Sequence, residues 1–308
     1  SHRDYLKSFT PRGDAKQVAY LVGTGNIVRA SADAGTGSEE TLGSGPFIKL
    51  IQQVANDKNI GAVIVRIDSP GGDASASDEI LRELKLLSEK KPMVISMSDV
   101  AASGGYYIAM TGDPILAYPG TLTGSIGIIY GKLNLKGLYD KVGVTKDLLS
   151  RGRNANIDSD YVPLSESERA KLISSMQEFY NGFVSKVAKA RKRSFEDINQ
   201  YAQGRVWLGD QAKAVGLVNE TAGLDRVIEL VKQKAKMRPE DRVRLVPFPG
   251  RRSVFDELLR ISQDPAADAD AQLEARVEKR LGQMVGLNLK LWQQGGFMHL
   301  MPYTVKIH

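Results

Sequence analysis

Two glycine-rich turns, Ser69–Gly72 and Ala101–Gly105, hold the residue types that could perform chemistry. Each directly follows a run of residues that predicts a β-strand. Glycine lacks Cβ, so the amides of the first turn can approach a ligand closely and stabilise an oxyanion. In the second turn Ser103 precedes a predicted helix start, where unpaired amides and the helix dipole favour a forming negative charge. Ser103 is therefore the candidate nucleophile of an acyl-transfer site.

Each turn also has an ordinary structural interpretation. Serine is a preferred N-cap residue, and Ser-Pro-Gly-Gly is a common turn sequence. The two turns lie about thirty residues apart and each closes a strand-to-helix step, an arrangement typical of ligand sites at the carboxyl ends of parallel strands. The pair would equally suit a crotonase-type acyl-CoA enzyme that uses backbone amides as an oxyanion hole and needs no nucleophile. Both alternatives remain open on the residues alone.

A nucleophilic serine needs a base, and the composition narrows the choice. The chain has no cysteine and three histidines, His2, His299 and His308, all near the chain ends. Disulfides, thiolate zinc sites and cysteine nucleophiles are thereby excluded, and a histidine-based hydrolase is disfavoured. We expect no metal or cofactor. The remaining base is a lysine whose pKa is lowered by burial. None of the lysines that follow the second turn has an apolar setting of that kind: Lys132, Lys136, Lys141 and Lys146.

The elements that position these turns alternate between strand-like and helix-like patterns, which predicts an α/β core with parallel strands. Ser165 and Glu168 fit a capping box at the start of a long helix. Strands are expected at Val18–Val22, Ala62–Ile67 and Pro92–Met97, and helices at Gly45–Asn56 and Ser77–Lys90; the alternation continues through Ile115–Ala117, Ile126–Tyr130, Leu135–Lys141 and Val144–Leu149, with short helices at Phe195–Gln203 and Asp210–Val215.

The 308 residues are 25% charged and 42% hydrophobic, as in a globular protein. The net charge of +6 permits contact with acidic surfaces, but the basic run lacks interleaved aromatic residues, so nucleic acid is not an expected partner. No apolar stretch approaches the ~20 residues of a bilayer span, and no signal peptide is recognisable.

A change of composition near residue 237 predicts a domain boundary. We expect an N-terminal extension over residues 1–16, an α/β domain over 17–237 and a helical extension over 238–308. The extension should contain helices at Val254–Ile261 and Leu273–Leu281. Its apolar tail, Gly295–Met298, is expected to dock on another part of the same assembly.

The two turns and their surroundings closely resemble the signal peptide peptidase A family, also called protease IV. The resemblance covers roughly residues 17 to 235, and its motifs occur in the family's order, which makes it specific. The residues that carry it are Ile67–Gly72, Met97–Ala109, Thr121–Ile128, Ala202–Trp207 and Ala212–Val218.

The resemblance implies a ClpP/crotonase-like α/β fold with parallel sheets and flanking helices. It also implies a Ser/Lys-dyad protease that cleaves signal-peptide remnants and other short hydrophobic peptides at a membrane. The family's nucleophile maps onto Ser103, the serine that orients the lysine onto Ser125, and the oxyanion amides onto Gly72 and Gly104. A homo-oligomer is expected, held on the extracytoplasmic (periplasmic) side of a membrane by a segment absent here.

One position departs from the family pattern. Family members with a complete site in one repeat place the catalytic lysine a little over fifty residues after the serine, and Ala155 stands there in this chain. Alanine cannot accept a proton. Three explanations fit. The lysine was replaced in order to trap the enzyme, the repeat has lost its activity, or the chain is the second half of a double-length protein whose first half supplies the lysine. We favour the last and expect the chain alone to be inactive, with the Ser103 hydroxyl open to an extended peptide.

Overall fold

The computed structural model describes residues 16–30, 41–249 and 298–300. The chain divides into two compact units. The first unit comprises residues 1–128, 180–250 and 298–308, and the second comprises residues 129–179 and 251–297. The candidate nucleophile and both glycine-rich turns belong to the first unit, whereas Ala155 belongs to the second.

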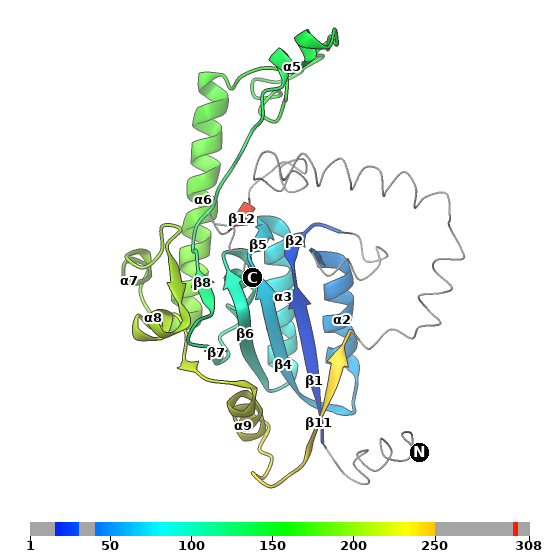
Figure 1. Cartoon of the computed structure of the whole chain (residues 1–308), viewed down its shortest axis with the longest axis vertical. Helices are drawn as coiled ribbons and strands as arrows, with labels where there is room; N and C mark the ends of the chain where they lie inside the picture. Colours follow the sequence, from blue (N-terminus) through cyan, green and yellow to red (C-terminus); the bar gives the residue numbers. More distant parts are fainter. Residues whose placement is uncertain (1–15, 31–40, 250–297, 301–308) are drawn as a thin grey trace, which may run out of the picture. The chain divides into compact units, whose positions relative to one another are not determined.

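The first unit contains a sheet in which β10, β7, β6, β4, β1 and β11 lie side by side in that order, each parallel to its neighbours (Figure 1). A short strand, β8, pairs parallel with the end of β6 and antiparallel with β9. The strands are β1 Lys16–Thr24, β4 Ile60–Ser69, β6 Met93–Ala102, β7 Ile115–Ala117, β8 Leu122–Gly124, β9 Val206–Leu208, β10 Glu220–Thr221 and β11 Val243–Phe248.

Both faces of this sheet are buried, because helices cover each of them. Along β4, Val63 and Val65 join the apolar cluster that includes residues of α2 (Ser44–Asn56) and α3 (Ala74–Lys90). Their neighbours Ala62 and Ile64 join a second cluster with Val227 and Val231 of α9 (Leu224–Lys234). Strands buried on both faces read as continuous apolar runs, which is why β4 is recognisable from the sequence. The expected α/β fold is confirmed.

A second, smaller sheet carries the first glycine-rich turn. Its strand order is β12-β5-β2-β3, with β2 parallel to β3 and β5 and with β12 antiparallel to β5. The short helix α4 (Gly104–Ile108) starts directly after Ser103. The strands of this sheet are β2 Asn26–Val28, β3 Thr41–Gly43, β5 Gly71–Asp73 and β12 Met298–Leu300.

The long helix α6 (Glu166–Arg191) begins in the second unit and ends in the first. The expected capping box is present. The amide of Ser165 donates to the Glu168 carboxylate at 2.8 Å, and the Glu168 amide donates to Ser165 Oγ at 3.3 Å. The second unit also contains α5 (Lys136–Lys141), which buries none of its residues. The remaining helices of the first unit are α7 Phe195–Asn199 and α8 Gly209–Ala214.

Several expected elements differ from those observed. Two expected elements, Ile126–Tyr130 and Val144–Leu149, form no regular helix or strand. In place of the first, the strand β8 lies a few residues earlier in the chain, at Leu122–Gly124. Helix α7 is shorter than the expected Phe195–Gln203. Strand β11 joins the main sheet beyond residue 237, and the domain boundary there stays a prediction. The expected helices Val254–Ile261 and Leu273–Leu281 lie outside the described residues. Within the described part, no helix is both long and apolar enough to cross a bilayer.

Candidate active site

Ser103 occupies a strained backbone position between β6 and α4. Its φ of 52° and ψ of −116° lie in a region that side chains other than glycine rarely adopt. Two hydrogen bonds hold it there, since its amide donates to Gly124 O at 2.8 Å and its carbonyl accepts from the Tyr107 amide at 2.8 Å. Strain of this kind costs about 1–3 kcal/mol, persists only where the surrounding structure imposes it, and is concentrated at functional sites.

The Ser103 side chain is fully buried, with 0% of its surface exposed. Among the described residues, its Oγ is the one buried side-chain oxygen or nitrogen without a hydrogen-bond partner. A buried hydroxyl without a partner costs about 1–3 kcal/mol, so the fold maintains it at the expense of stability. The expectation of an open hydroxyl is therefore wrong for this conformation, because the end of β6 lies within close-packed structure rather than at a surface.

The two glycine-rich turns lie in direct contact. A Cβ added to Gly104 would lie 3.1 Å from Gly72 N, 3.0 Å from Gly71 Cα and 2.8 Å from Ser77 Oγ. A Cβ added to Gly72, whose φ is +155°, would lie 1.9 Å from the carbonyl oxygen of Ile27. A side chain at Gly72 would require a backbone shift, and one at Gly104 would crowd Ser77 and the first turn. The structure thus brings together both glycines that the family resemblance assigns to the oxyanion hole.

Ser125 lies beside Ser103 on the neighbouring segment of chain. Ala102 and Gly124, the last residues of β6 and β8, are paired, and the residue that follows each strand is a serine. Ser125 is buried and also has a positive φ, 49°, and its amide donates to Arg205 O at 2.8 Å. The structure therefore brings together Ser103, Ser125, Gly72 and Gly104. Their catalytic roles stay predictions.

Two tyrosines that the sequence did not single out anchor α4 behind Ser103. The Tyr106 hydroxyl donates to Leu217 O at 2.7 Å, and the Tyr107 hydroxyl donates to Asp78 Oδ1 at 2.6 Å. Burial raises the pKa of both phenols, and the hydrogen bond to Asp78 adds to the rise at Tyr107. Both hydroxyls therefore remain protonated donors. The sequence could have indicated these two tyrosines, because the third and fourth residues after an N-cap serine lie on the first turn of the helix that the serine caps.

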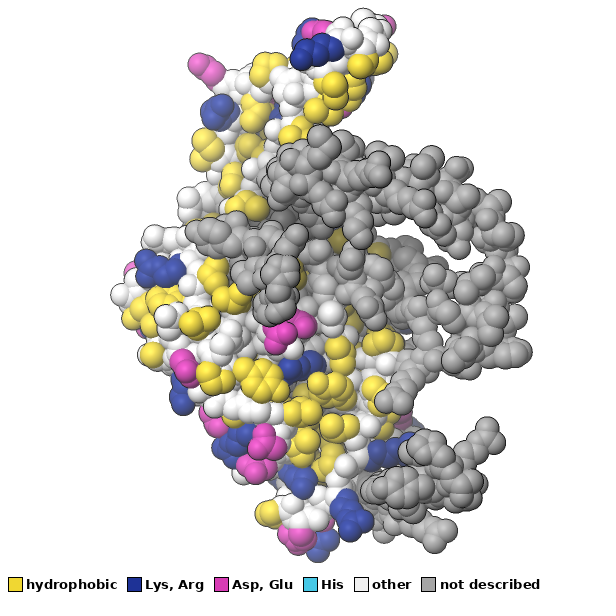
Figure 2. Space-filling view, viewed as in Figure 1, with side chains coloured by type: hydrophobic (Ala, Val, Ile, Leu, Met, Phe, Trp, Pro, Cys, Tyr) yellow, Lys and Arg dark blue, Asp and Glu magenta, His cyan; other side chains and the backbone are white. Residues whose placement is uncertain are grey.

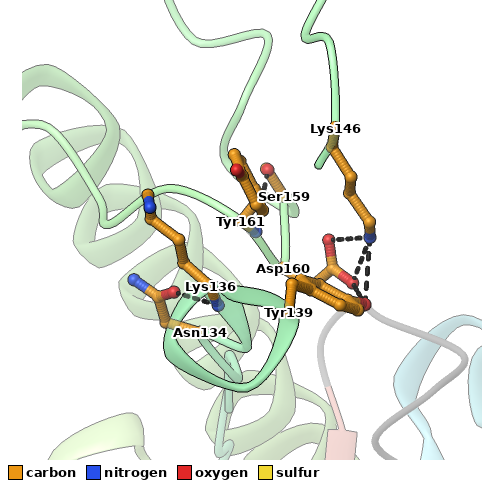
Figure 3. Close-up of polar contacts among 7 residues, drawn as sticks. All are labelled: Asn134, Lys136, Tyr139, Lys146, Ser159, Asp160 and Tyr161. Atoms are coloured by element: carbon orange, nitrogen blue, oxygen red, sulfur yellow. Dashed lines mark hydrogen bonds and ion pairs between the residues drawn. The ribbon is translucent and has the colours of Figure 1, made fainter. Parts of the chain in front are cut away.

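Two lysines of the second unit, Lys136 and Lys146, are held in the charged form by neighbouring carboxylates. Lys146 donates to both carboxylate oxygens of Asp160 at 2.7 Å and to the Tyr139 hydroxyl at 3.0 Å (Figure 3). The hydrogen bond to Asp160 raises the pKa of Lys146, so its amine stays protonated. Lys136 pairs in the same way with Asp140 at 2.8 Å, and this contact raises the pKa of Lys136.

Ala155 lies in a turn of the second unit, where its amide donates to Gly152 O at 3.4 Å. The ammonium of Lys132 reaches the adjoining residue and donates to Asn156 O at 3.2 Å. Glu168 accepts from the Asn156 amide at 3.2 Å, and its pKa is lowered chiefly by hydrogen bonds from Ser165. The turn that would hold the family's lysine thus has alanine at that position, which offers no group to accept a proton.

Comparisons with known proteins place the chain among relatives that are named as proteases. The chain is 41% identical over 76% of its length to a protein of Arabidopsis thaliana named serine protease SPPA, chloroplastic, and covers 35% of that protein. It is 33% identical over 78% of its length to protease 4 of Haemophilus influenzae and covers 39% of it. It is 31% identical over 68% of its length to a putative signal peptide peptidase SppA of Enterococcus faecium, and covers 62% of it.

A solved structure of a ClpP1 mutant from Listeria monocytogenes aligns with a TM-score of 0.41 and 18% identity, over 66% of this chain and 90% of that one. The chain spans about a third of the length of the first two relatives. The model of peptidase family S49 matches residues 85–238, a range that contains Ser103, Gly104, Ser125 and Ala155. The chain belongs to peptidase family S49.

Proposed function

We propose that this chain forms the nucleophile-bearing part of a serine endopeptidase that degrades short apolar peptides, including remnants of cleaved signal peptides. The observation that carries the proposal is the Ser103 hydroxyl, which is held at a strained position without a hydrogen-bond partner beside Gly72 and Gly104. Membership of a peptidase family and the names of the relatives support it. We expect the complete enzyme to be a homo-oligomer on the extracytoplasmic side of a membrane.

The reaction follows from these groups. Ser103 Oγ attacks the peptide carbonyl carbon while its proton passes to a neutral lysine amine. The amides of Gly72 and Gly104 donate to the oxyanion that forms. Collapse of this intermediate breaks the C–N bond, and the lysine returns the proton to the departing amine. Water then attacks the acyl ester, with the same lysine as base, and frees Ser103. Ser125 would orient the lysine through a hydrogen bond.

The lysine is proposed to come from another repeat or from a second subunit. Ala155 cannot accept a proton, and Lys136 and Lys146 are held in the charged form by Asp140 and Asp160. The chain covers little more than a third of protease 4 of Haemophilus influenzae, which leaves most of that relative's length without a counterpart here. Burial or a neighbouring positive charge lowers the pKa of a lysine, so the partner has to place its amine in one of these two settings.

The test is hydrolysis of a fluorogenic apolar peptide by the 308-residue chain with and without a lysine-bearing partner repeat. We expect negligible turnover by the chain alone, turnover with the partner, and loss of that turnover in Ser103→Ala. Ala155→Lys in the chain alone should restore part of the activity, whereas the similarly long but uncharged Ala155→Met should not.

Other outcomes separate the alternatives. Robust hydrolysis by the unaltered chain that Ser103→Ala abolishes would refute the external lysine and retain the nucleophile; Lys132→Met would then test the amine beside Ala155. Turnover of an acyl thioester that survives Ser103→Ala would identify a crotonase-type enzyme instead. Failure of a fluorophosphonate probe to label Ser103 even with the partner repeat present would indicate a non-catalytic assembly module.

A further inference from the structure

The first glycine-rich turn and the helix that follows it form one continuous piece of structure. Helix α3 begins directly after β5, and the Asp73 carboxylate caps it by accepting from the Ala76 amide at 2.7 Å. The Ser77 hydroxyl donates to the carbonyl oxygen of Asp73 at 2.8 Å. The amide of Gly72, proposed as one donor to the oxyanion, is therefore fixed to the first turns of α3.

The second proposed donor belongs to a different helix. Gly104 is the first residue of α4, and the Tyr107 amide closes the first turn of this helix by donating to the carbonyl oxygen of Ser103 at 2.8 Å. The side chain of Tyr107 reaches α3, where its hydroxyl donates to Asp78 Oδ1 at 2.6 Å. This hydrogen bond joins the helix of one oxyanion donor to the helix of the other.

Contacts from α6 hold both partners of this hydrogen bond. Tyr107 is 4% exposed, and its ring meets that of Phe183 at a centroid distance of 4.7 Å and an angle of 62°. The ammonium of Lys186 lies 3.2 Å from Asp78 Oδ1 and 5.5 Å from the centroid of the Tyr107 ring. Burial opposes ionisation of Asp78, but the hydrogen bond from Tyr107 and the charge of Lys186 outweigh it and lower the pKa of Asp78. The acceptor is therefore a charged carboxylate, which strengthens the hydrogen bond.

Two oxyanion donors act together only when their spacing is accurate. Each amide must lie about 2.7–3.1 Å from the oxygen that becomes charged, so a displacement of about 0.5 Å between them weakens the stabilisation. A Cβ on Gly104 would lie 3.1 Å from Gly72 N and 2.8 Å from Ser77 Oγ, which shows how closely the two turns approach. A glycine has no side chain to hold it, so neighbouring residues must set this spacing.

We propose that Asp78 and Tyr107 are positioning residues for the candidate oxyanion hole. Their hydrogen bond sets the spacing between the amides of the two glycines, and Lys186 holds the Asp78 carboxylate in place for it. Tyr106 on the same helix has a different role, because its hydroxyl donates to Leu217 O, which belongs to neither turn. The effect on hydrolysis rests on the proposed function, whereas the spacing of the amides does not.

The experiment removes the hydrogen bond from either side in the full 308-residue chain. Tyr107→Phe deletes the donor, Asp78→Ala deletes the acceptor, and Asp78→Asn keeps an acceptor oxygen without the charge. Tyr106→Phe is the matched control, because it deletes a buried phenol hydroxyl from the same helix. The NMR signals of the Gly72 and Gly104 amides, recorded on the chain alone, report the geometry of the two donors.

We expect Tyr107→Phe and Asp78→Ala to shift both glycine signals, and the variant with both substitutions to shift them no further, because all three proteins lack the same contact. Asp78→Asn should shift them less. Tyr106→Phe should lower the midpoint of thermal unfolding while the Gly72 signal stays in place. Unshifted glycine signals in Tyr107→Phe and Asp78→Ala would overturn the proposal, as would an equal shift of the Gly72 signal in Tyr106→Phe.

A peptide aldehyde and the alcohol of the same sequence separate positioning from a loss of stability when the lysine-bearing repeat is present. Ser103 Oγ adds to the aldehyde carbon and passes its proton to the lysine, so the former carbonyl oxygen faces both amides; the alcohol forms no such adduct. Tyr107→Phe and Asp78→Ala should lower the aldehyde-to-alcohol affinity ratio about tenfold, and kcat by a similar factor with KM nearly unchanged. Tyr106→Phe should keep the ratio within about twofold of the unaltered chain.

The two sets of measurements decide the proposal and the proposed function separately. Shifted glycine signals, with neither aldehyde binding nor turnover even in the unaltered chain with its partner, would refute the proposed function and retain the contact that spaces the amides. Turnover with an unchanged affinity ratio in Tyr107→Phe would retain the function and refute the positioning role. If Tyr107→Phe fails to fold, Asp78→Asn and Lys186→Met take its place, each with a smaller expected change in the same direction.

Discussion

The site-bearing part of the first unit and the described part of the second unit, residues 129–179, are stabilised in different ways. In the first unit Ser103, Gly72 and Gly104 are held by close packing; Gly72 leaves no room for a Cβ, and a Cβ at Gly104 would be crowded. In the second unit polar contacts such as Lys146–Asp160 join partly exposed residues, while Leu149 is 100% exposed. Close packing fixes a geometry tightly, whereas exposed ion pairs contribute little and weaken with salt.

The exposed apolar residues of the second unit strengthen this contrast. Helix α5 and the residues after it place apolar side chains among charged ones on the surface, as Figure 2 shows for one face. Single exposed apolar residues are common in soluble proteins, but a concentration of them within one small unit marks a contact surface. The first unit thus holds its candidate site by close packing, whereas the second exposes apolar side chains that a partner could cover. The exposed residues are Leu133, Leu138, Val142, Val144, Leu148, Leu149 and Ile173.

The largest effect is expected for Gly72→Ala in the first unit. The added Cβ would lie 1.9 Å from the carbonyl oxygen of Ile27, so β2 or β5 must move and unfolding should become easier by more than ~4 kcal/mol. Urea denaturation measures the change. Gly120→Ala is the control, because a Cβ there meets nothing within 4 Å and should shift stability by less than ~0.5 kcal/mol. Similar effects of both substitutions would contradict the tight contact.

A matched pair of leucines compares the two units directly. Leu84 is 0% exposed within the main apolar cluster, whereas Leu149 is 100% exposed. Leu84→Ala should cost about 2–5 kcal/mol through lost burial and a residual cavity. Leu149→Ala should change stability by less than ~0.5 kcal/mol. The midpoints of urea unfolding test both, and a large cost at Leu149 would show that the second unit is packed in solution against something that covers it.

A smaller effect is expected at the nucleophile. Ser103 has a φ of 52°, a conformation that costs glycine little and other residues more. Ser103→Gly should therefore be about 1 kcal/mol more stable than Ser103→Ala, which keeps the strained backbone. Both variants should be inactive with the partner repeat. Thermal unfolding compares the two, and a more stable alanine variant would show that the backbone of Ser103 is unstrained in solution.

The smallest effect is expected for the exposed ion pair of the second unit. Hydrogen bonds from Lys146 and Tyr139 lower the pKa of Asp160 below its ordinary value of 3.8. A group whose pKa is lower in the folded state than in the unfolded state stabilises the fold at pH values above the unfolded pKa. This stabilisation is lost as the pH falls through the folded pKa. The protection of residues 136–161 against hydrogen exchange, measured relative to the intrinsic exchange rate at each pH, should therefore fall slightly below about pH 4, and Asp160→Asn should remove that dependence. Comparison of Asp160→Asn, Lys146→Met and the variant with both substitutions measures the interaction energy between Lys146 and Asp160. An undiminished pH response in Asp160→Asn would assign it to another group.

The elements predicted from the sequence are those whose burial follows a simple pattern. Helices at Gly45–Asn56 and Ser77–Lys90 and strands at Val18–Val22 and Ala62–Ile67 all correspond to observed elements. The prediction failed at Val144–Leu149, a run with apolar residues that has no strand to pair with among the described residues and stays largely exposed. Apolar spacing indicates which residues can be buried, but only a neighbouring element buries them.

Strands β11 and β12 could not be located in advance for a related reason. Strand β11 pairs with β1 across more than two hundred residues of sequence, and β12 pairs with β5 over a similar separation. Each is short and bounded by residues without a regular pattern. Their pairing partners are therefore selected by the open strand edges of the folded chain, which local sequence does not encode.

The sequence alone determined the α/β core, the family, and the residues that meet at the candidate site, because glycines, a lone serine motif and alternating apolar runs are local features. The tertiary structure decided three further properties: the contact between Gly72 and Gly104, the closed and unpartnered hydroxyl of Ser103, and the pairing of Met298–Leu300 with β5. All three depend on which distant segments pack together, and that is settled by the burial and pairing of the whole chain.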